Sequence, residues 1–247
     1  MRDETSYRTI APYYDWIMAH VDYDAWGRYL GKVWRKFGVE PKAILELGAG
    51  TCPFARREVY PSDSRVIYSD LSPFMLSQAQ DILSGGRVAA NALALPFRGP
   101  FQLCVMIYDA INYLMEEEDV ERCFEEVLRV LGQGGLFIFD ITTEENSRRH
   151  FHQAVDFGEL EGCTYFRESS FDKESQLQSN DFIFFVEGRP ASWRKVKECH
   201  QQRIYKVERI RALAEEAGFS VDGVFEGFTF RSGRETSERV HFVLRKP

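Results

Sequence analysis

A short apolar run that ends in two glycines constrains the fold of this chain more than any other segment. Residues 43–47 read Ala-Ile-Leu-Glu-Leu, which is the pattern of a buried strand, and Gly48 and Gly50 follow at once. Pro53 is suited to the first turn of a helix. Because glycines let the backbone approach a ligand at the positive end of a helix, this segment predicts a nucleotide site in an α/β fold.

The segments after this turn alternate between strand and helix patterns. Ser72 can cap a helix that begins at Pro73, and an amphipathic helix over 116–131 is ended by Gly132. The expected strands cover residues 65–70, 87–90, 101–108 and 135–140. This alternation predicts a doubly wound, mostly parallel sheet.

The two ends of the chain and the region after Asp140 follow other patterns. Residues 7–37 have helical spacing of apolar side chains, and we expect Pro12 and Gly27 to break this helix. After Asp140 no helix is evident until 207–217. The strands expected before that helix are 165–172, 177–187 and 192–202, with a hairpin turn at Gly188-Arg189-Pro190. Two more strands, 221–230 and 239–245, are expected after it. The sequence therefore predicts an antiparallel insertion over 141–203 within a domain made of 1–140 and 204–247.

Composition narrows the class of partner. The 247 residues carry a formal net charge of −7, so a long polyanion such as nucleic acid is a poor partner. The five cysteines form no C-x-x-C pair, and no apolar leader or membrane-length apolar run is present. We expect a cytoplasmic protein with reduced thiols that binds neither nucleic acid nor membrane.

Asp70 is the second residue that points to a nucleotide. It lies 20 residues after Gly50, at the end of the next expected strand, where a carboxylate can accept hydrogen bonds from both hydroxyls of a ribose. A dinucleotide fingerprint requires a third glycine where this chain has Pro53. The residues alone leave open an adenosyl group or a dinucleotide.

Five segments in order resemble the motifs of class I S-adenosylmethionine (SAM) dependent methyltransferases. They read ILELGAGTC, YSDLSPFMLSQAQ, NALALPF, FQLCVMIYDAINYL and LGQGGLFIFD, and they cover about residues 40–140. Weaker similarity at both ends is to a small-molecule subgroup that includes sugar-amine N-methyltransferases. The resemblance implies a Rossmann-like, seven-stranded sheet with an antiparallel insertion after the fifth strand, SAM as cofactor, and methyl transfer to a small-molecule amine or hydroxyl.

The resemblance also implies roles for individual residues. Glu46, Gly48 and Gly50 would line the methionine side of SAM, and Asp70 would hold its ribose. The other implied cofactor contacts are Leu71 and Met75 at the adenine, Asn91, Ala92 and Leu93 at its edge, Tyr108 under the sulfonium, and Tyr14 and Trp26 closing the site. We expect the acceptor to contact Asn112, Tyr113, His200 and Arg203. No residue is assigned a catalytic role, because methyl transfer needs alignment more than a general base.

Several alternatives stay open at this point. Cys52 replaces the third glycine of the family loop, and a thiol near a helix start can have a low pKa. His150 and His152 have the spacing of a metal pair on a strand, but no third ligand is nearby, so no metal is predicted. A NAD-type oxidoreductase and a SAM-binding protein without catalysis are the alternative functions.

Overall fold

The computed structural model describes residues 7–81, 86–188 and 192–247. Its centre is a seven-stranded sheet, sheet A, in the order β10-β11-β5-β4-β1-β2-β3. The strands are β1 (Ala43–Leu47), β2 (Arg65–Asp70), β3 (Arg87–Ala89), β4 (Phe101–Met106), β5 (Leu131–Thr142), β10 (Ser220–Glu226) and β11 (Arg239–Arg245). Five neighbouring strands are parallel, while β11 is antiparallel to both β5 and β10. The predicted doubly wound, mostly parallel sheet is confirmed.

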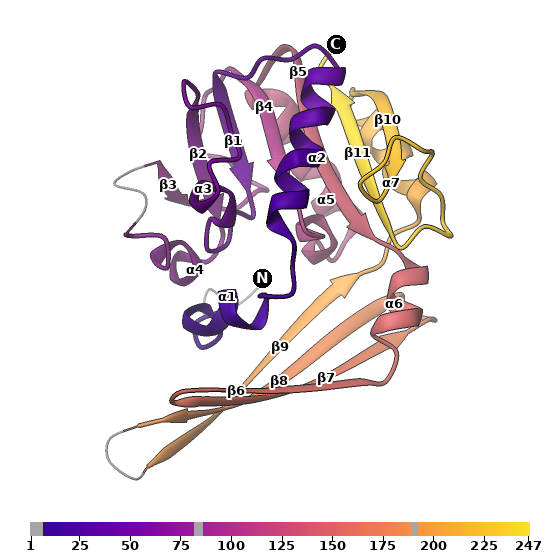
Figure 1. Cartoon of the computed structure of the whole chain (residues 1–247). Helices are drawn as coiled ribbons and strands as arrows, with labels where there is room; N and C mark the ends of the chain where they lie inside the picture. The colour runs from indigo at the N-terminus through magenta and orange to yellow at the C-terminus, as the bar shows by residue number, and fades with distance from the viewer. Residues whose placement is uncertain (1–6, 82–85, 189–191) are drawn as a thin grey trace.

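Helices cover both faces of sheet A (Figure 1). The helices of the core are α2 (Tyr23–Lys36), α3 (Pro53–Arg56), α4 (Pro73–Ser77), α5 (Glu117–Val130) and α7 (Val207–Glu216). On one face Leu30 of α2 packs with Ile44 of β1, and on the other Phe124 of α5 packs with Phe137 of β5. All four side chains are fully buried. Burial of this kind on both faces explains why β1 and β4 read as continuous apolar runs.

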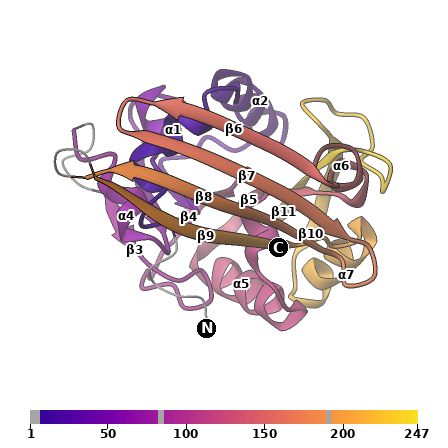
Figure 2. The ribbon, with the colours of Figure 1, turned by 90° about the horizontal axis from the view of Figure 1, so that it is seen from below.

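A second sheet, sheet B, lies across the end of the core at which β1 and β4 terminate (Figure 1). It is antiparallel, and its strands are β6 (Ala154–Leu160), β7 (Cys163–Asp172), β8 (Leu177–Glu187) and β9 (Trp193–Arg203). Figure 2 shows the four strands side by side beneath the core. One face packs against the N-terminal segment, where Ile10 and Ile17 meet Tyr165 and Phe184. That segment contains η1 (Ala11–Tyr13) and α1 (Tyr14–Ile17). The core and sheet B therefore enclose η1 and α1 between them.

Three local predictions and one open alternative were wrong. Gly27 does not break a helix but lies inside α2, where an added Cβ would come within 2.6 Å of Val59. The fifth strand covers Leu131–Thr142 rather than the predicted 135–140. An additional helix, α6 (Glu144–His150), ends at His150, and β6 follows it, so His150 and His152 are not a pair on a strand.

Other boundaries agree more closely. The helix over 7–37 is interrupted near Pro12, as predicted, because η1 and α1 precede α2. Ser72 caps α4, since its side chain accepts a hydrogen bond from the Met75 N–H. The turn predicted at Gly188-Arg189-Pro190 falls partly on 189–191, outside the described residues. Within the described ranges, no helix is both long and apolar enough to cross a bilayer.

Candidate functional site

A cavity of about 350 Å³ opens where the carboxyl ends of β1, β2 and β4 meet sheet B and the N-terminal segment. Most residues predicted to contact cofactor line it. They are Tyr14, Glu46, Gly48, Gly50, Asp70, Leu71, Met75, Asn91, Ala92 and Tyr108. Tyr113 and His200, which were predicted to contact the methyl acceptor, also line the cavity. Ligands of open α/β sheets bind at this edge of the sheet, so the position fits a cofactor site.

The glycine loop has the geometry that close approach of a ligand requires. Gly48 and Gly50 have φ of +62° and +55°, and a Cβ on Gly48 would lie 2.9 Å from the Ala110 Cβ. Cys52 adopts the same left-handed region with φ +56°. A cysteine therefore holds the backbone conformation that glycine favours, and the loop keeps its shape.

The Cys52 thiol is a packed side chain. It is fully buried, and burial raises its pKa to about 12, with the Glu46 carboxylate adding to the effect. A raised pKa keeps the sulfur protonated and unreactive at neutral pH. The alternative of a low-pKa thiol is wrong.

Asp70 organises the floor of the cavity. Its Oδ2 accepts a hydrogen bond from the Gly50 N–H and its Oδ1 from the Ser72 N–H, each at 2.8 Å. Burial raises the pKa of this carboxyl, and the two backbone bonds oppose the rise. A carboxylate has about four acceptor positions, so both oxygens can still accept from the hydroxyls of a ribose. The site therefore fits an adenosyl group.

Glu46 is a second carboxyl at the same floor. It is 2% exposed, and the Tyr60 hydroxyl donates to its Oε2 at 2.7 Å. Burial raises its pKa to about 8, although the Tyr60 bond favours the charged form. Without a cation beside it, Glu46 is thus mostly protonated at pH 7.

Aromatic side chains form the wall opposite the glycine loop. The Tyr7 ring centroid lies 4.4 Å from that of His200, 6.1 Å from Tyr14 and 6.2 Å from Tyr113. His200 projects from β9, and its Nε2 is 3.4 Å from the Glu198 Oε2. Glu198 is largely buried, and its Oε1 also accepts a hydrogen bond from the Thr9 N–H at 2.6 Å. This wall combines apolar ring surface with phenol, imidazole and carboxylate groups.

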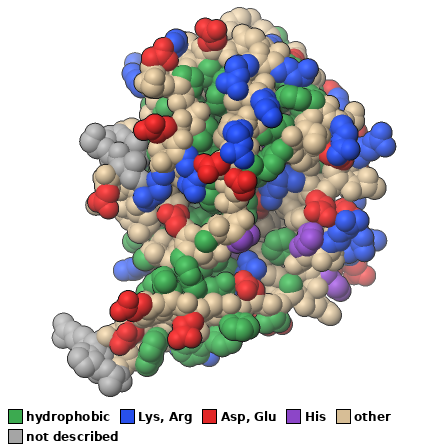
Figure 3. Space-filling view, in the orientation of Figure 1, with side chains coloured by type: hydrophobic (Ala, Val, Ile, Leu, Met, Phe, Trp, Pro, Cys, Tyr) green, Lys and Arg blue, Asp and Glu red, His purple; other side chains and the backbone are tan. Residues whose placement is uncertain are grey.

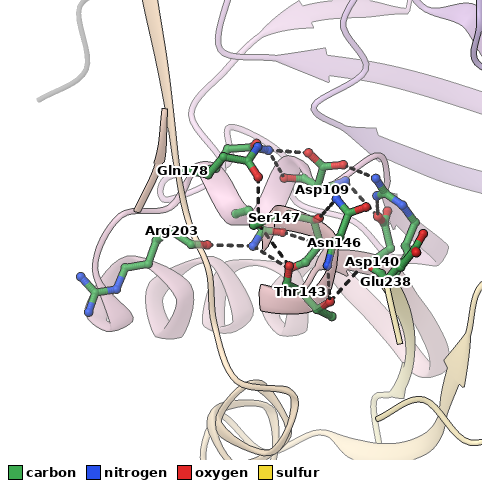
Figure 4. A network of polar contacts seen from close by, with 12 residues as sticks. Asp109, Asp140, Thr143, Asn146, Ser147, Gln178, Arg203 and Glu238 are labelled. Carbon is green, nitrogen blue, oxygen red and sulfur yellow. Dashed lines mark hydrogen bonds and ion pairs between the residues drawn. The ribbon is translucent and has the colours of Figure 1, made fainter. Parts of the chain in front are cut away.

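The structure places four predicted residues away from the cavity lining. Trp26 packs in the core beneath the Arg239 guanidinium, and Leu93 packs against the cluster around α5. Asn112 is fully buried, where its Oδ1 accepts from the Thr142 N–H and its Nδ2 donates to the Arg203 carbonyl. In Figure 4 the side chain of Arg203 points away from the polar network. Asn112 thus joins both ends of the insertion to the loop after β4.

A buried ionic network lies beside the cavity (Figure 4). The Arg239 guanidinium donates to Asp109 at 2.6 Å and to Asp140, and the Gln202 amide also donates to Asp109. Tyr108 and Asp109 both have positive φ, at +61° and +50°. Left-handed backbone at two adjacent non-glycine residues is sustained only by strong surrounding contacts. The network therefore holds Tyr108 at the cavity.

Sequence reasoning did not find Tyr7, Glu198 or this network. Glu198 and His200 are two residues apart, and such residues point to the same face of a strand, so alternation on β9 could have paired them. Asp109 and Arg239 are 130 residues apart, and no local pattern joins them. No group of three or more His, Cys, Asp or Glu in the described ranges is arranged to hold a metal ion.

Comparison with known proteins identifies similar methyltransferases. Residues 44–135 match the family model described as "Methyltransferase domain". A protein of Geobacillus sp. (strain WCH70), named as a methyltransferase, is 29% identical over 98% of this chain and 100% of its own length. The YqeM protein of Bacillus subtilis (strain 168), with the same type of name, is 28% identical over 97% of both chains. Residues 44–135 of this chain form a methyltransferase domain.

Solved structures give the same fold for the whole methyltransferase. A SAM-dependent methyltransferase from Clostridium acetobutylicum superposes with a TM-score of 0.81 at 23% identity, over 97% of this chain and 98% of that one. The sugar N-methyltransferase KedS8 from Streptoalloteichus sp. superposes with a TM-score of 0.76 at 18% identity, over 94% and 92%. The Rossmann-like fold with an antiparallel insertion is confirmed.

Proposed function

We propose that this methyltransferase transfers the methyl group of SAM to an amine or hydroxyl of a small-molecule acceptor by in-line displacement. One observation carries the proposal: a single cavity is bounded by the predicted cofactor residues on one side and by Tyr7, Tyr113 and His200 on the other. An acceptor held there lies between its own recognition groups and the cofactor. The proposed cofactor contacts are the cavity-lining residues of the predicted set.

In this reaction the protein mainly holds the acceptor and the cofactor in place. Bound SAM supplies a methyl group that is already activated by the sulfonium. The rings of Tyr7, Tyr14 and Tyr113 cover the acceptor side and exclude water, while the ionic network around Asp109 fixes Tyr108. Holding a nucleophile in line within van der Waals contact removes much of the barrier.

His200 is the group we propose for removing a proton from the acceptor. Its Nε2 lies 3.4 Å from the largely buried Glu198 carboxylate, and a carboxylate in that position orients an imidazole. An acceptor hydroxyl, or an amine that arrives protonated, loses a proton during transfer. Tyr7 is a poor proton acceptor, because burial raises the pKa of its phenol well above the ordinary value and keeps it protonated.

The names of similar proteins record methylation at nitrogen and at oxygen. KedS8 is a sugar N-methyltransferase by its name. A malonyl-[acyl-carrier protein] O-methyltransferase of Geobacter sulfurreducens is 37% identical to this chain over 134 residues, or 48% of each protein.

The five cysteines are unpaired, which supports a reducing compartment such as the cytoplasm.

The test combines cofactor titration with turnover. Calorimetry with SAM and with NAD is followed by assays of S-adenosylhomocysteine formation against amine and hydroxyl libraries. We expect SAM binding and turnover by the wild type, with His200→Gln lowering kcat while SAM affinity is kept. Lys32→Ala, on the exposed side of α2, is the control. NAD binding without SAM binding would refute the proposal, and SAM binding without turnover of either library would favour the non-catalytic alternative.

A further inference from the structure

Gln202 connects the acceptor wall to the loop that carries Tyr108. On β9, His200 and Gln202 are buried and face the core, because residues two apart point to the same side of a strand. They are thus turned away from the lower surface of the molecule, where Figure 3 shows hydrophobic side chains gathered. The Gln202 Nε2 donates a hydrogen bond to the Asp109 Oδ2, and Asp109 directly follows Tyr108. One hydrogen bond therefore joins β9 to the cofactor cavity.

Gln202 is the last member of a chain of buried side chains that crosses sheet B. The Ser147 hydroxyl of α6 donates to the Gln178 Oε1 at 2.8 Å, and the Gln178 Nε2 donates to the Gln202 Oε1 at 2.9 Å. All three side chains are at most 3% exposed. In Figure 4, Ser147, Gln178 and Asp109 point toward one another at the junction of the core and sheet B.

The carboxylate of Asp109 sets the direction of this chain. A carboxylate only accepts hydrogen bonds, and its two oxygens accept from the Arg239 guanidinium and from the Gln202 amide. Gln202 must therefore turn its NH2 group toward Asp109 and its carbonyl toward Gln178. The same rule then orients Gln178, whose carbonyl is left to accept from Ser147. A single charged group thus fixes two buried amides on two strands.

The bond from Gln202 also supports an unfavourable backbone conformation. Tyr108 and Asp109 have φ of +61° and +50°, a region that non-glycine residues occupy only where surrounding contacts hold them. Asp140 and Arg239 bond to Asp109 from sheet A, and Gln202 bonds to it from sheet B. Loss of the Gln202 bond should therefore let Tyr108 move within the cofactor cavity.

The insertion has another attachment to the same loop. Asn112 binds the Thr142 N–H at 3.0 Å and the Arg203 carbonyl at 2.7 Å, and so holds both ends of the insertion. The Gln202 bond reaches a different point, the residue beside Tyr108. It is therefore placed to transmit a change at β9 to the cofactor, and not only to attach sheet B.

We propose that Gln202 is a positioning residue for methyl transfer, which couples the acceptor wall on β9 to Tyr108 at the cofactor. The coupling rests on the proposed function, which places the acceptor against His200. An acceptor there holds the inner face of β9 in place, and with it the bond from Gln202 to Asp109. Coupling between two sites is reciprocal, so acceptor and cofactor should each strengthen the binding of the other by the same factor.

Calorimetric titration with SAM tests the link to the cofactor. Gln202→Met keeps the length of the side chain and removes its hydrogen bonds, so the Kd for SAM should rise roughly fivefold or more. The matched control is Ser169→Ala, which removes a buried hydrogen bond of 2.7 Å to Asn180 between β7 and β8 and should leave the Kd unchanged. An unchanged Kd in Gln202→Met would overturn the proposal. A wild type that binds no SAM would refute the proposed function and the coupling together.

A complex that cannot react measures the coupling itself. The Kd for S-adenosylhomocysteine is determined with and without the amine or hydroxyl of highest turnover in the library. In the wild type and in Ser169→Ala, this acceptor should lower the Kd roughly fivefold or more. In Gln202→Met the acceptor should leave it nearly unchanged. An equal effect of the acceptor in the wild type and in Gln202→Met would overturn the coupling.

A reciprocal exchange separates this role from a general loss of stability. Gln202→Glu alone sets two acceptors against each other, and Asp109→Asn alone sets two donors against each other, so each should weaken SAM binding. The double variant Asp109→Asn with Gln202→Glu keeps the chain, because an amide at position 109 can accept from Arg239 and donate to a carboxylate at position 202. That carboxylate can still accept from Gln178. We expect the double variant to regain SAM affinity, and one that stays as weak as the single variants would contradict the proposal.

Discussion

Binding of SAM should release a proton from Glu46. Burial raises the pKa of this carboxyl to about 8 in the free chain, so at pH 7 it holds about 0.9 proton. Glu46 is the carboxyl proposed to face the methionine side of SAM, and an ammonium group beside it would favour the charged form. We therefore expect about 0.9 proton to be released for each SAM bound at pH 7. Below pH 8, the affinity for SAM should increase by up to roughly tenfold for each unit by which the pH is raised.

Calorimetry in buffers with different heats of ionisation measures this number directly. The slope of the observed enthalpy against the buffer enthalpy gives the protons released. Glu46→Gln should bring the slope close to zero, whereas Glu126→Gln should not, because ion pairing with Arg129 lowers the pKa of Glu126 and keeps it ionised. Tyr60→Phe removes the hydrogen bond that favours the charged form, and it should extend proton release to higher pH. A wild-type slope near zero at pH 7 would refute the reasoning.

Three further predictions concern binding and stability. Asp70→Asn should weaken SAM binding by roughly 10- to 100-fold in calorimetry, since charge-assisted hydrogen bonds contribute about 1.5–3 kcal/mol; an unchanged Kd would exclude Asp70 as the ribose ligand. Asn112→Ala leaves the buried Thr142 N–H without its side-chain partner at 3.0 Å, so urea unfolding should show a loss of about 1–3 kcal/mol, and full stability would contradict that role. In the free chain, the raised pKa of Glu46 lowers the free energy of unfolding as the pH rises from 4.5 to about 8, and Glu46→Gln should flatten that decline in thermal melts.

The core could be predicted because its signals are local. The apolar runs of β1 and β4 predict buried strands, because strands buried on both faces have few polar residues. The glycine turn after β1 predicts the edge of the sheet at which a ligand binds. Ser72 likewise signals the start of α4. The parallel order of the sheet followed from the alternation of strands with helices.

The failures involve elements whose cause lies elsewhere in the chain. The α6 segment reads EENSRRH and has no apolar stripe, so it is held instead by its Thr143 cap and by contacts such as Ser147 with Gln178. Gly27 has low helix propensity, yet packing against Val59 favours it inside α2. The side-chain amide of Asn112 could contact a ligand, but it forms hydrogen bonds with the Arg203 carbonyl and the Thr142 N–H instead. Asn112 is therefore a structural bridge between segments that are distant in the sequence.

The N-terminal segment has a consequence for how the molecule forms. Its residues are synthesised before those of sheet B, but the Thr9 N–H donates to Glu198, 189 positions later, and Ile10 packs in the same cluster as Phe184. Contacts that span such a separation close slowly, because a long loop must be ordered before they form. A growing chain can complete β1 to β5 while Thr9 and Ile10 still lack these partners. We therefore expect the acceptor side of the cavity to be the last part of the enzyme to assemble.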